Sequence, residues 1–253
     1  MPGYDVIGNI AILKFPEKTE NIKKKKIAFE LLKKQKNIKT VLEKVDKVKG
    51  RLRTIKTRFL AGKNTRETIH KESGCLFKLD VEKCYFSPRL SGERAEIVKK
   101  IKSKDKVLVM FSGIAPFSIV IAKLSGARKI VSIELGEFCC KYARENILLN
   151  KTNNVEIIQG DVKKVVSKLK EKFDKIVMPR PQLKETFLKQ AFSVSKKGTI
   201  IFYYDFGKEE KEILEKIGKE AGKYKKRIKI LGIKKAGDIA PYKYRFRVDF
   251  KIN

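Results

Sequence analysis

The sequence lacks the features that mark membrane and secreted proteins. No apolar run approaches the roughly 20 residues of a membrane-spanning helix. The first residues, MPGYD, are not a basic segment followed by an apolar one, so no signal peptide is predicted. The four cysteines have no CxxC spacing, and the adjacent Cys139 and Cys140 suit neither a metal site nor a disulfide. We therefore predict a cytoplasmic protein with no membrane partner and no bound metal.

Acidic residues are scarce relative to basic ones. The 253 residues include 61 lysines and arginines against 29 aspartates and glutamates, which gives a formal net charge of +32. A field of this sign favours a polyanionic partner, and nucleic acid is the commonest one. Most of the excess is lysine, which can also reflect genome composition or a hot habitat, so the charge alone does not identify the nucleic acid.

The first part of the chain combines strand patterns with a lysine-rich helix. Strands are predicted at residues 4–15 (a pair or one bent strand, with a bulge or bend at Gly8), 40–45 and 50–60. Residues 22–35 have the apolar spacing of a helix that begins with the lysines Lys23–Lys26. Lysines in a first turn oppose the helix dipole, so they form either an anion-binding surface or a solvated face. We predict that residues 1–73 form a small, basic α/β domain.

The second part, residues 74–253, alternates strands and helices. Strands are predicted at residues 106–111, 129–134, 155–159, 174–178 and 198–204, and helices at 116–124, 138–149, 183–192 and 208–222. Two further strands, at 228–233 and 244–252, lie close enough in the chain to pair antiparallel. This order predicts a doubly wound, Rossmann-like α/β sheet.

In such a sheet, ligands bind beyond the carboxyl ends of the strands. Gly113 follows the first strand, where it either admits a ligand to the backbone or only makes a turn. Glu134 ends the second strand about 20 residues later, a usual place for a carboxylate that binds ribose hydroxyls; the alternative is a helix-start carboxylate. Asp161 follows the third strand, as an acceptor for an adenine amino group or as an N-cap. The fourth strand runs into the stiff corner Pro179-Arg180-Pro181.

The complete GxGxxG fingerprint of dinucleotide-binding proteins is missing, so no pyrophosphate cradle is predicted. The four strand ends together favour S-adenosylmethionine over NAD as the cofactor. The paired final strands also suit the seven-stranded sheet of class I S-adenosylmethionine-dependent methyltransferases. We predict that fold for residues 74–253.

Several segments resemble the archaeal and eukaryotic tRNA (guanine-37-N1)-methyltransferases. The longest are TIHKESGC at residues 68–75, YFSPRLSGER at 85–94 and MFSGIAPFSI at 110–119, and shorter ones are ENI at 145–147, LNK at 149–151, YYDF at 203–206 and AP at 240–241. YFSPRL is the most specific, and the aminocarboxypropyltransferases of the wybutosine pathway, which use the same fold and cofactor, share part of it. The resemblance covers nearly the whole chain, although the family's extra N-terminal domain is expected to be missing.

The resemblance implies an enzyme that transfers a methyl group from S-adenosylmethionine to N1 of guanine 37, with the tRNA anticodon stem-loop as its partner. It is expected to act as a monomer whose N-terminal domain contacts tRNA phosphates. Arg89 would stabilise charge on guanine O6, unless it only pairs with Glu93. Glu134 would be the base or would serve only the ribose, while Arg180 and Pro181 would hold the target base. The implied cofactor-binding residues are Phe111, Gly113, Pro116, Glu134, Asp161 and Pro179.

Three departures from the family pattern leave the activity open. Val109 stands where the family has an acid, and Leu135-Gly136-Glu137 replaces a usual INP. Pro179 replaces the asparagine of the family's NLP or NPP corner, so Arg180 would supply the missing donor, contact a phosphate or point into solvent. The alternatives are an aminocarboxypropyltransferase and a tRNA-binding protein without catalysis.

Overall fold

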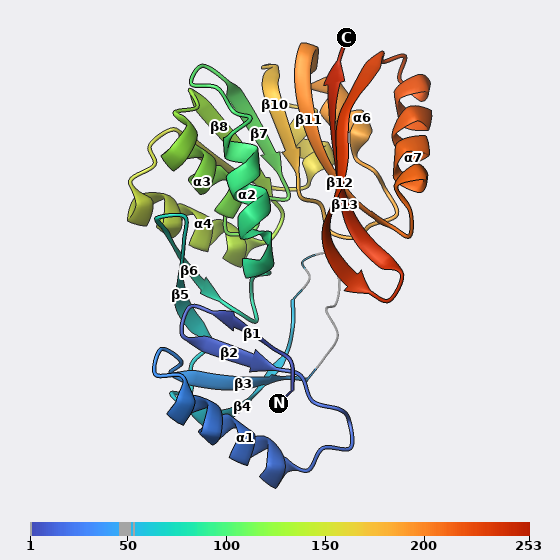
Figure 1. The fold of residues 1–253 in the computed structure, drawn as a ribbon. Helices are drawn as coiled ribbons and strands as arrows, with labels where there is room; N and C mark the ends of the chain where they lie inside the picture. The colour runs from blue at the N-terminus through green and yellow to red at the C-terminus, as the bar shows by residue number, and fades with distance from the viewer. Residues whose placement is uncertain (1, 46–51, 53) are drawn as a thin grey trace. The chain divides into compact units, whose positions relative to one another are not determined.

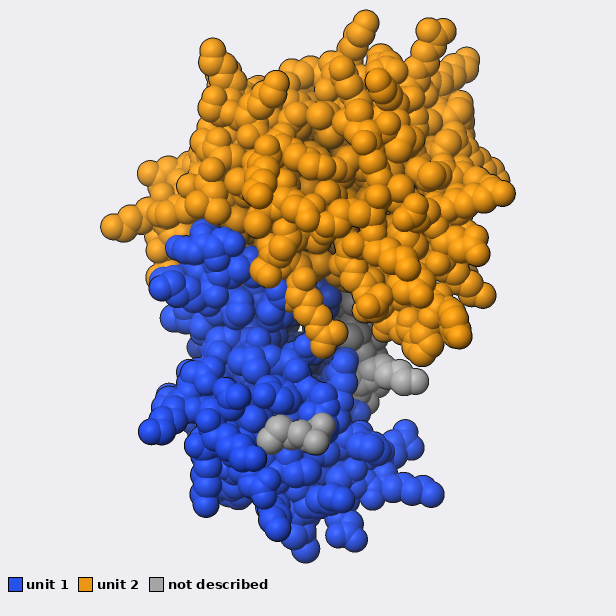
Figure 2. Space-filling model, viewed as in Figure 1, with its two compact units in different colours: residues 1–88 blue, residues 89–253 orange. Residues whose placement is uncertain are grey.

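The computed structural model describes residues 2–45, 52 and 54–253 (Figure 1). The chain divides into two compact units, Met1–Pro88 and Arg89–Asn253 (Figure 2). The sequence predicted a domain boundary after residue 73, which differs from this division. That position is the tip of the hairpin formed by β5 (Glu67–Glu72) and β6 (Cys75–Asp80). That hairpin lies wholly within the first unit.

The N-terminal unit contains a four-stranded sheet with the order β1-β2-β3-β4. Its strands are β1 (Tyr4–Ile7), β2 (Ile10–Leu13), β3 (Thr40–Lys44) and β4 (Thr57–Gly62). Helix α1 (Asn21–Lys34) packs on this sheet through Ala28 and Leu31, which are buried against Leu13 and Val41 (Figure 1). The predicted strand pair and helix are thus confirmed.

Gly8 makes the turn between β1 and β2. Its φ is +56°, and a Cβ there would lie 2.5 Å from the carbonyl oxygen of Ile69. The turn therefore admits only glycine, as the predicted bend requires. The strand predicted at residues 50–60 begins only at Thr57, and part of that prediction (residues 50, 51 and 53) lies outside the described residues.

The C-terminal unit is built on a seven-stranded sheet with the order β12-β13-β11-β10-β7-β8-β9. The strands are β7 (Lys106–Met110), β8 (Lys129–Glu134), β9 (Val155–Gln159), β10 (Phe173–Met178), β11 (Ser195–Gly207), β12 (Ile228–Ala240) and β13 (Lys243–Ile252). Neighbours from β11 through β9 pair in parallel, while β13 pairs antiparallel with both β11 and β12. The predicted sheet is confirmed, with longer final strands than the sequence suggested.

Helices cover both faces of this sheet (Figure 1). They are α2 (Ser91–Val98), α3 (Pro116–Ser125), α4 (Glu137–Asn150), α5 (Val162–Val166), α6 (Leu188–Ser193) and α7 (Glu210–Lys223). Leu108 and Met110 of β7 pack with α5, α6 and α7, whereas Val107 and Val109 pack with α2 and α3. Because successive side chains of a strand point to opposite faces, these two cores lie on opposite sides of the sheet.

Several elements differ from the sequence prediction. Helix α6 begins only at Leu188, because Pro181 and the loop that follows it occupy the start of the predicted helix. The short helices α2 and α5 and the hairpin β5–β6 were not predicted at all. Among the described residues, no helix is long and apolar enough to cross a membrane.

Candidate active site

The loop after β7 holds three residues in the left-handed conformation. Phe111, Gly113 and Ala115 have φ values of +59°, +57° and +64°. For the two residues with a Cβ this costs roughly 1–2 kcal/mol each. Hydrogen bonds hold the loop, from Ser112 N–H to the Ile133 carbonyl (3.0 Å) and from Ala115 N–H to the Ser112 carbonyl (2.9 Å). Strain of this kind is concentrated at ligand-binding loops.

Glu134 ends β8 and ties this loop to the next one. One carboxylate oxygen accepts the Gly113 N–H at 2.7 Å, and the other accepts the Gly136 N–H at 2.8 Å. The side chain is buried, and burial raises the pKa of Glu134 above its ordinary value, while the N–H groups of Gly136, Gly113 and Leu135 oppose that rise. Among the residues that the structure describes, backbone groups alone fix the carboxylate at the sheet edge, and its further lone pairs are available to ligand hydroxyls.

The residues around Glu134 fit an adenosine-containing cofactor. The Ser112 hydroxyl oxygen is buried, with no hydrogen-bond partner among the residues that the structure describes. Such a group needs a partner, and a bound polar ligand would supply one. The rings of Phe111 and Phe187 form an edge-to-face pair with centroids 4.9 Å apart. Backbone donors, an unpaired hydroxyl and apolar rings suit a cofactor with both a ribose and an aromatic base.

The third strand end is joined to the second through the backbone. Gly160 N–H donates to the Glu134 carbonyl at 2.8 Å. The side chain of Asp161 accepts the Lys163 N–H at 2.9 Å and caps α5. The N-cap interpretation of Asp161 is therefore confirmed, while its contact with an adenine amino group stays a prediction.

The fourth strand end is built around a buried cation. Arg180 is 2% exposed, so it does not point into solvent. Its guanidinium donates to the Tyr203 hydroxyl (3.3 Å), to the Pro181 carbonyl (3.1 Å) and twice to the Leu183 carbonyl (3.3 and 3.1 Å). It also forms an ion pair with Asp205 at 3.0 Å. Every N–H of this side chain has an acceptor here, so none is left for a base or a phosphate.

Asp205 holds Arg180 from the neighbouring strand β11. Its carboxylate also accepts the Tyr203 hydroxyl at 3.0 Å and the Phe206 N–H at 2.8 Å, and it binds Lys216 of α7 at 2.8 Å. Burial raises the pKa of Tyr203, so this phenol stays protonated and donates. The YYDF segment contributes to the family resemblance, but the sequence analysis assigns its residues no role. The signal that could have indicated a role for Asp205 is a carboxylate within an apolar strand, next to two tyrosines.

Arg89 and Glu93 have different environments. Arg89 is exposed, in the single 3-10 turn Pro88–Leu90 that leads into α2. Glu93 is buried, and its carboxylate binds the Tyr204 hydroxyl (2.9 Å), Arg247 (2.7 Å) and Lys234 (2.8 Å). Those contacts fix α2 to the sheet. The role of Arg89 at guanine O6 stays a prediction.

The structure brings most of the predicted site residues to one edge of the sheet. Glu134 binds Gly113 directly and Gly160 through its carbonyl, and β10, which ends at the Pro179 corner, lies beside β7. Pro116 is the first residue of α3, where its missing N–H costs nothing. Val109, at the position of the family acid, is a fully buried core residue.

The fold and this strand-end site define a class I S-adenosylmethionine-dependent methyltransferase. The family model of the TRM5/TYW2 methyltransferase domain matches residues 68–231, and that of the TYW2 N-terminal domain matches residues 2–65. The chain belongs to the TRM5/TYW2 family.

Three similar proteins represent this family. The chain is 38% identical to the tRNA (guanine(37)-N(1))-methyltransferase Trm5b of Pyrococcus abyssi, over 99% of this chain and 74% of that protein. It is 35% identical to the tRNA(Phe) (4-demethylwyosine(37)-C(7)) aminocarboxypropyltransferase of Methanocaldococcus jannaschii, over 80% of this chain and 77% of the relative. The solved complex of aTrm5 and tRNALeu superposes with a TM-score of 0.89 at 34% identity, covering 99% of this chain and 72% of that one.

Proposed function

We propose that this protein is a tRNA methyltransferase that methylates N1 of guanine 37, next to the anticodon. The observation that carries the proposal is the buried Glu134 carboxylate, bound to the backbone of two adjacent strand ends. The net charge of +32 and the similarity to proteins that are named for this reaction support tRNA as the substrate. When bound, S-adenosylmethionine supplies an electrophilic methyl group.

Methyl transfer to guanine N1 requires removal of its proton while negative charge develops on O6. We assign the stabilisation of that charge to Arg89, an exposed residue at the start of the C-terminal unit. We assign Glu134 to the ribose, because both of its oxygens are already oriented by backbone N–H groups. In the alternative assignment, Glu134 accepts the N1 proton instead of binding the ribose.

In the Pro179-Arg180-Pro181 corner, we assign the two prolines to the wall that holds the target base. Arg180 acts as a positioning residue, since its guanidinium binds the carbonyls of Pro181 and Leu183. This differs from the direct contact with the base or a phosphate that the sequence suggested. The corner is rigid because a buried ion pair between Arg180 and Asp205 holds it.

The N-terminal unit would contact tRNA phosphates through α1. Lys23, Lys25 and Lys26 are exposed, whereas Lys24 is buried and binds Glu43 at 2.6 Å. Three of the four lysines are thus available for the predicted contact, and the fourth belongs to the core of the unit. A monomeric, cytoplasmic enzyme stays a prediction, which sedimentation and fractionation would check.

Aminocarboxypropyl transfer is the second candidate. Pro179 in place of the family asparagine and the 35% identity to a named aminocarboxypropyltransferase favour it. The two reactions use the same cofactor but add groups of different mass. A third candidate, tRNA binding without catalysis, predicts no need for cofactor binding, which calorimetry with S-adenosylmethionine would measure.

The test uses two tRNA transcripts that differ only at position 37. S-adenosylmethionine labelled in its methyl group is incubated with the protein and either the guanine-37 or the adenine-37 transcript. We expect label in the first and none in the second. Equal labelling of both transcripts, or of neither, would contradict the proposed function.

A further inference from the structure

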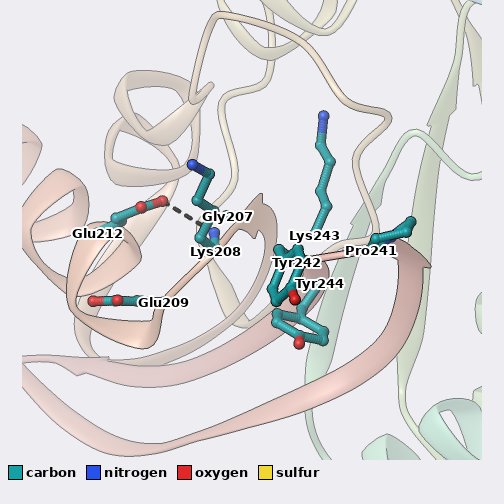
Figure 3. A pocket seen from close by; sticks show the side chains of 8 residues that line it. All are labelled: Gly207, Lys208, Glu209, Glu212, Pro241, Tyr242, Lys243 and Tyr244. Atoms are coloured by element: carbon teal, nitrogen blue, oxygen red, sulfur yellow. Dashed lines mark hydrogen bonds between the residues drawn. The ribbon is translucent and has the colours of Figure 1, made fainter.

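A second concavity lies in the C-terminal unit, apart from the cofactor-binding strand ends (Figure 3). It has a volume of about 740 Å³. One wall is the junction of β11 and α7, and the other is the turn between β12 and β13. The lining residues are Gly207, Lys208, Glu209 and Glu212 on the first wall and Pro241, Tyr242, Lys243 and Tyr244 on the second.

The sheet places this pocket on the edge that carries the active site. β11 runs parallel to β10, with Met178 beside Tyr203, and Gly207 pairs with Tyr244 of β13. Gly207 is four residues beyond Tyr203, which is about 13 Å at the usual rise of a strand. The pocket therefore lies past the carboxyl end of β10, on the side of the Pro179 corner that faces away from β8.

The aromatic residues of the pocket suit a nucleobase. Tyr242 is 78% exposed and has a left-handed φ of +56°, so the tip of the hairpin presents its ring to solvent. Tyr244 also lines the pocket (Figure 3), and the Lys235 ammonium lies 3.9 Å from the centre of the Tyr244 ring. Aromatic faces with adjacent lysines are the usual platform for unpaired nucleotides.

The polar groups of the pocket are available for a ligand. The side chains of Lys208, Glu209, Tyr242 and Lys243 have no hydrogen-bond or ion-pair partner among residues 2–45, 52 and 54–253. The two ammonium groups suit a phosphate, and the Glu209 carboxylate suits an exocyclic amino group. Glu212 instead accepts the Lys208 N–H at 3.2 Å and so shapes the wall.

We propose that this pocket binds an unstacked nucleotide of the tRNA that flanks the target base, with its base against Tyr242 and its phosphate between Lys208 and Lys243. This inference rests on the proposed function and names a further contact of that substrate. A base extruded into the active site leaves its neighbours without a stacking partner, and the pocket supplies one on the same edge of the sheet.

The first experiment measures the affinity of Tyr242 variants for an anticodon stem-loop RNA. Tyr242→Ala should weaken binding by about tenfold, the scale of one lost base–aromatic stack. Tyr242→Phe should bind as the parent does, whereas Tyr242→Leu, which keeps apolar area without a ring, should resemble the alanine variant. Affinity for S-adenosylmethionine should not change in any of them.

A pair of charge-matched variants tests the phosphate contact. Lys208→Ala with Lys243→Ala should reduce the salt dependence of RNA binding. Lys211→Ala with Lys219→Ala removes the same charge from exposed positions of α7 outside the pocket and should reduce it less. Equal effects of the two pairs would overturn the assignment of a local phosphate site.

The nucleotide is located by combining Tyr242→Ala with abasic substitutions on each side of position 37. At the bound nucleotide the two changes should be non-additive, because each removes the same stack. Full additivity at every position, or parental affinity of Tyr242→Ala, would overturn the inference while leaving the proposed function intact. A parent protein that neither binds nor methylates tRNA would overturn both.

Discussion

The corner after β8 and the corner after β10 occupy equivalent places on the sheet but are built from opposite charges. Glu134 is held by the N–H groups of Gly113 and Gly136 and retains accepting capacity. Arg180 has an acceptor for each of its donors and is enclosed by Tyr203, Asp205 and the loop that it stabilises. The first corner keeps acceptor capacity for a ligand, and the second is held rigid by its own contacts.

The same distinction divides the lysines of α1. Lys24 is buried, with its ammonium on Glu43, while Lys23, Lys25 and Lys26 are exposed on the same turn. A surplus of basic residues in a sequence therefore combines two populations, one that maintains the fold and one that is exposed on the surface. Substitutions that separate the two populations test this view directly.

The largest expected effect is on stability, from Arg180→Ala. Removing the guanidinium leaves the buried Asp205 without its arginine, and breaking a buried pair costs about 3–5 kcal/mol. Urea denaturation measures it as a lower transition midpoint. Arg180→Lys, which keeps the charge but not the fork of donors, should recover only part of the loss. A fully stable Arg180→Ala would show that the corner does not depend on this residue.

Glu134→Ala should weaken cofactor binding and leave the folding stability nearly unchanged, the opposite of the pattern expected for Arg180→Ala. Loss of a charge-assisted pair of hydrogen bonds predicts roughly 2–4 kcal/mol weaker binding of S-adenosylmethionine. Calorimetry measures the affinity, and Glu137→Ala, which removes an exposed carboxylate three residues away, is the matched control. Unchanged affinity in Glu134→Ala would remove Glu134 from the site.

Arg89→Ala should lower turnover by about 10²-fold with nearly normal cofactor affinity, because the cation acts on charge that develops in the transition state. Single-turnover methylation of tRNA measures the rate, and Arg89→Lys tests whether charge alone is sufficient. A large loss of cofactor affinity in Arg89→Ala, with an unchanged turnover per bound cofactor, would contradict this assignment.

Replacing Lys23, Lys25 and Lys26 by alanine should weaken tRNA binding and flatten its salt dependence by up to about 0.9 in slope for each lost phosphate contact. Lys24→Ala is the internal control: it should lower stability and leave the slope unchanged, since its ammonium binds Glu43. An unchanged slope in the triple variant would contradict a phosphate contact by α1.

The smallest expected effect is a pH-dependent change in the cofactor-free protein. The pKa of folded Glu134 lies above its ordinary value of 4.5, so the stability that this group contributes is fully present below that value and is lost as pH rises through the folded pKa. Glu134→Gln should therefore melt at a higher temperature than the parent at pH 8, where only the parent carries the buried charge. The difference should vanish toward pH 4.5, and a constant difference would argue against titration of this group.

Much of the sheet was predictable because strand patterns and strand ends are local features. The predicted bounds of β8 and β9 agree with the structure, and Gly113 and Glu134 meet as their spacing suggested. The short helix α5 escaped prediction because five residues carry too little periodicity to detect.

The environments of individual charges were not predictable, because they depend on residues far away in the chain. Nothing near Arg180 in the sequence announces Asp205, which reaches it from the adjacent strand. Lys24 could not be distinguished from its three neighbours until β3 placed Glu43 beside it. Burial and pairing across strands decide such roles, and a single sequence does not display them.

The most direct test of the central claim is the identity of the product. A guanine-37 tRNA transcript is treated with the protein and S-adenosylmethionine, then digested, and the modified nucleoside is identified by mass and by its position in the chain. The account predicts one added methyl group on N1 of guanine 37. An aminocarboxypropyl group in its place, a methyl group elsewhere in the tRNA, or an unmodified transcript with a protein that binds the cofactor would contradict it.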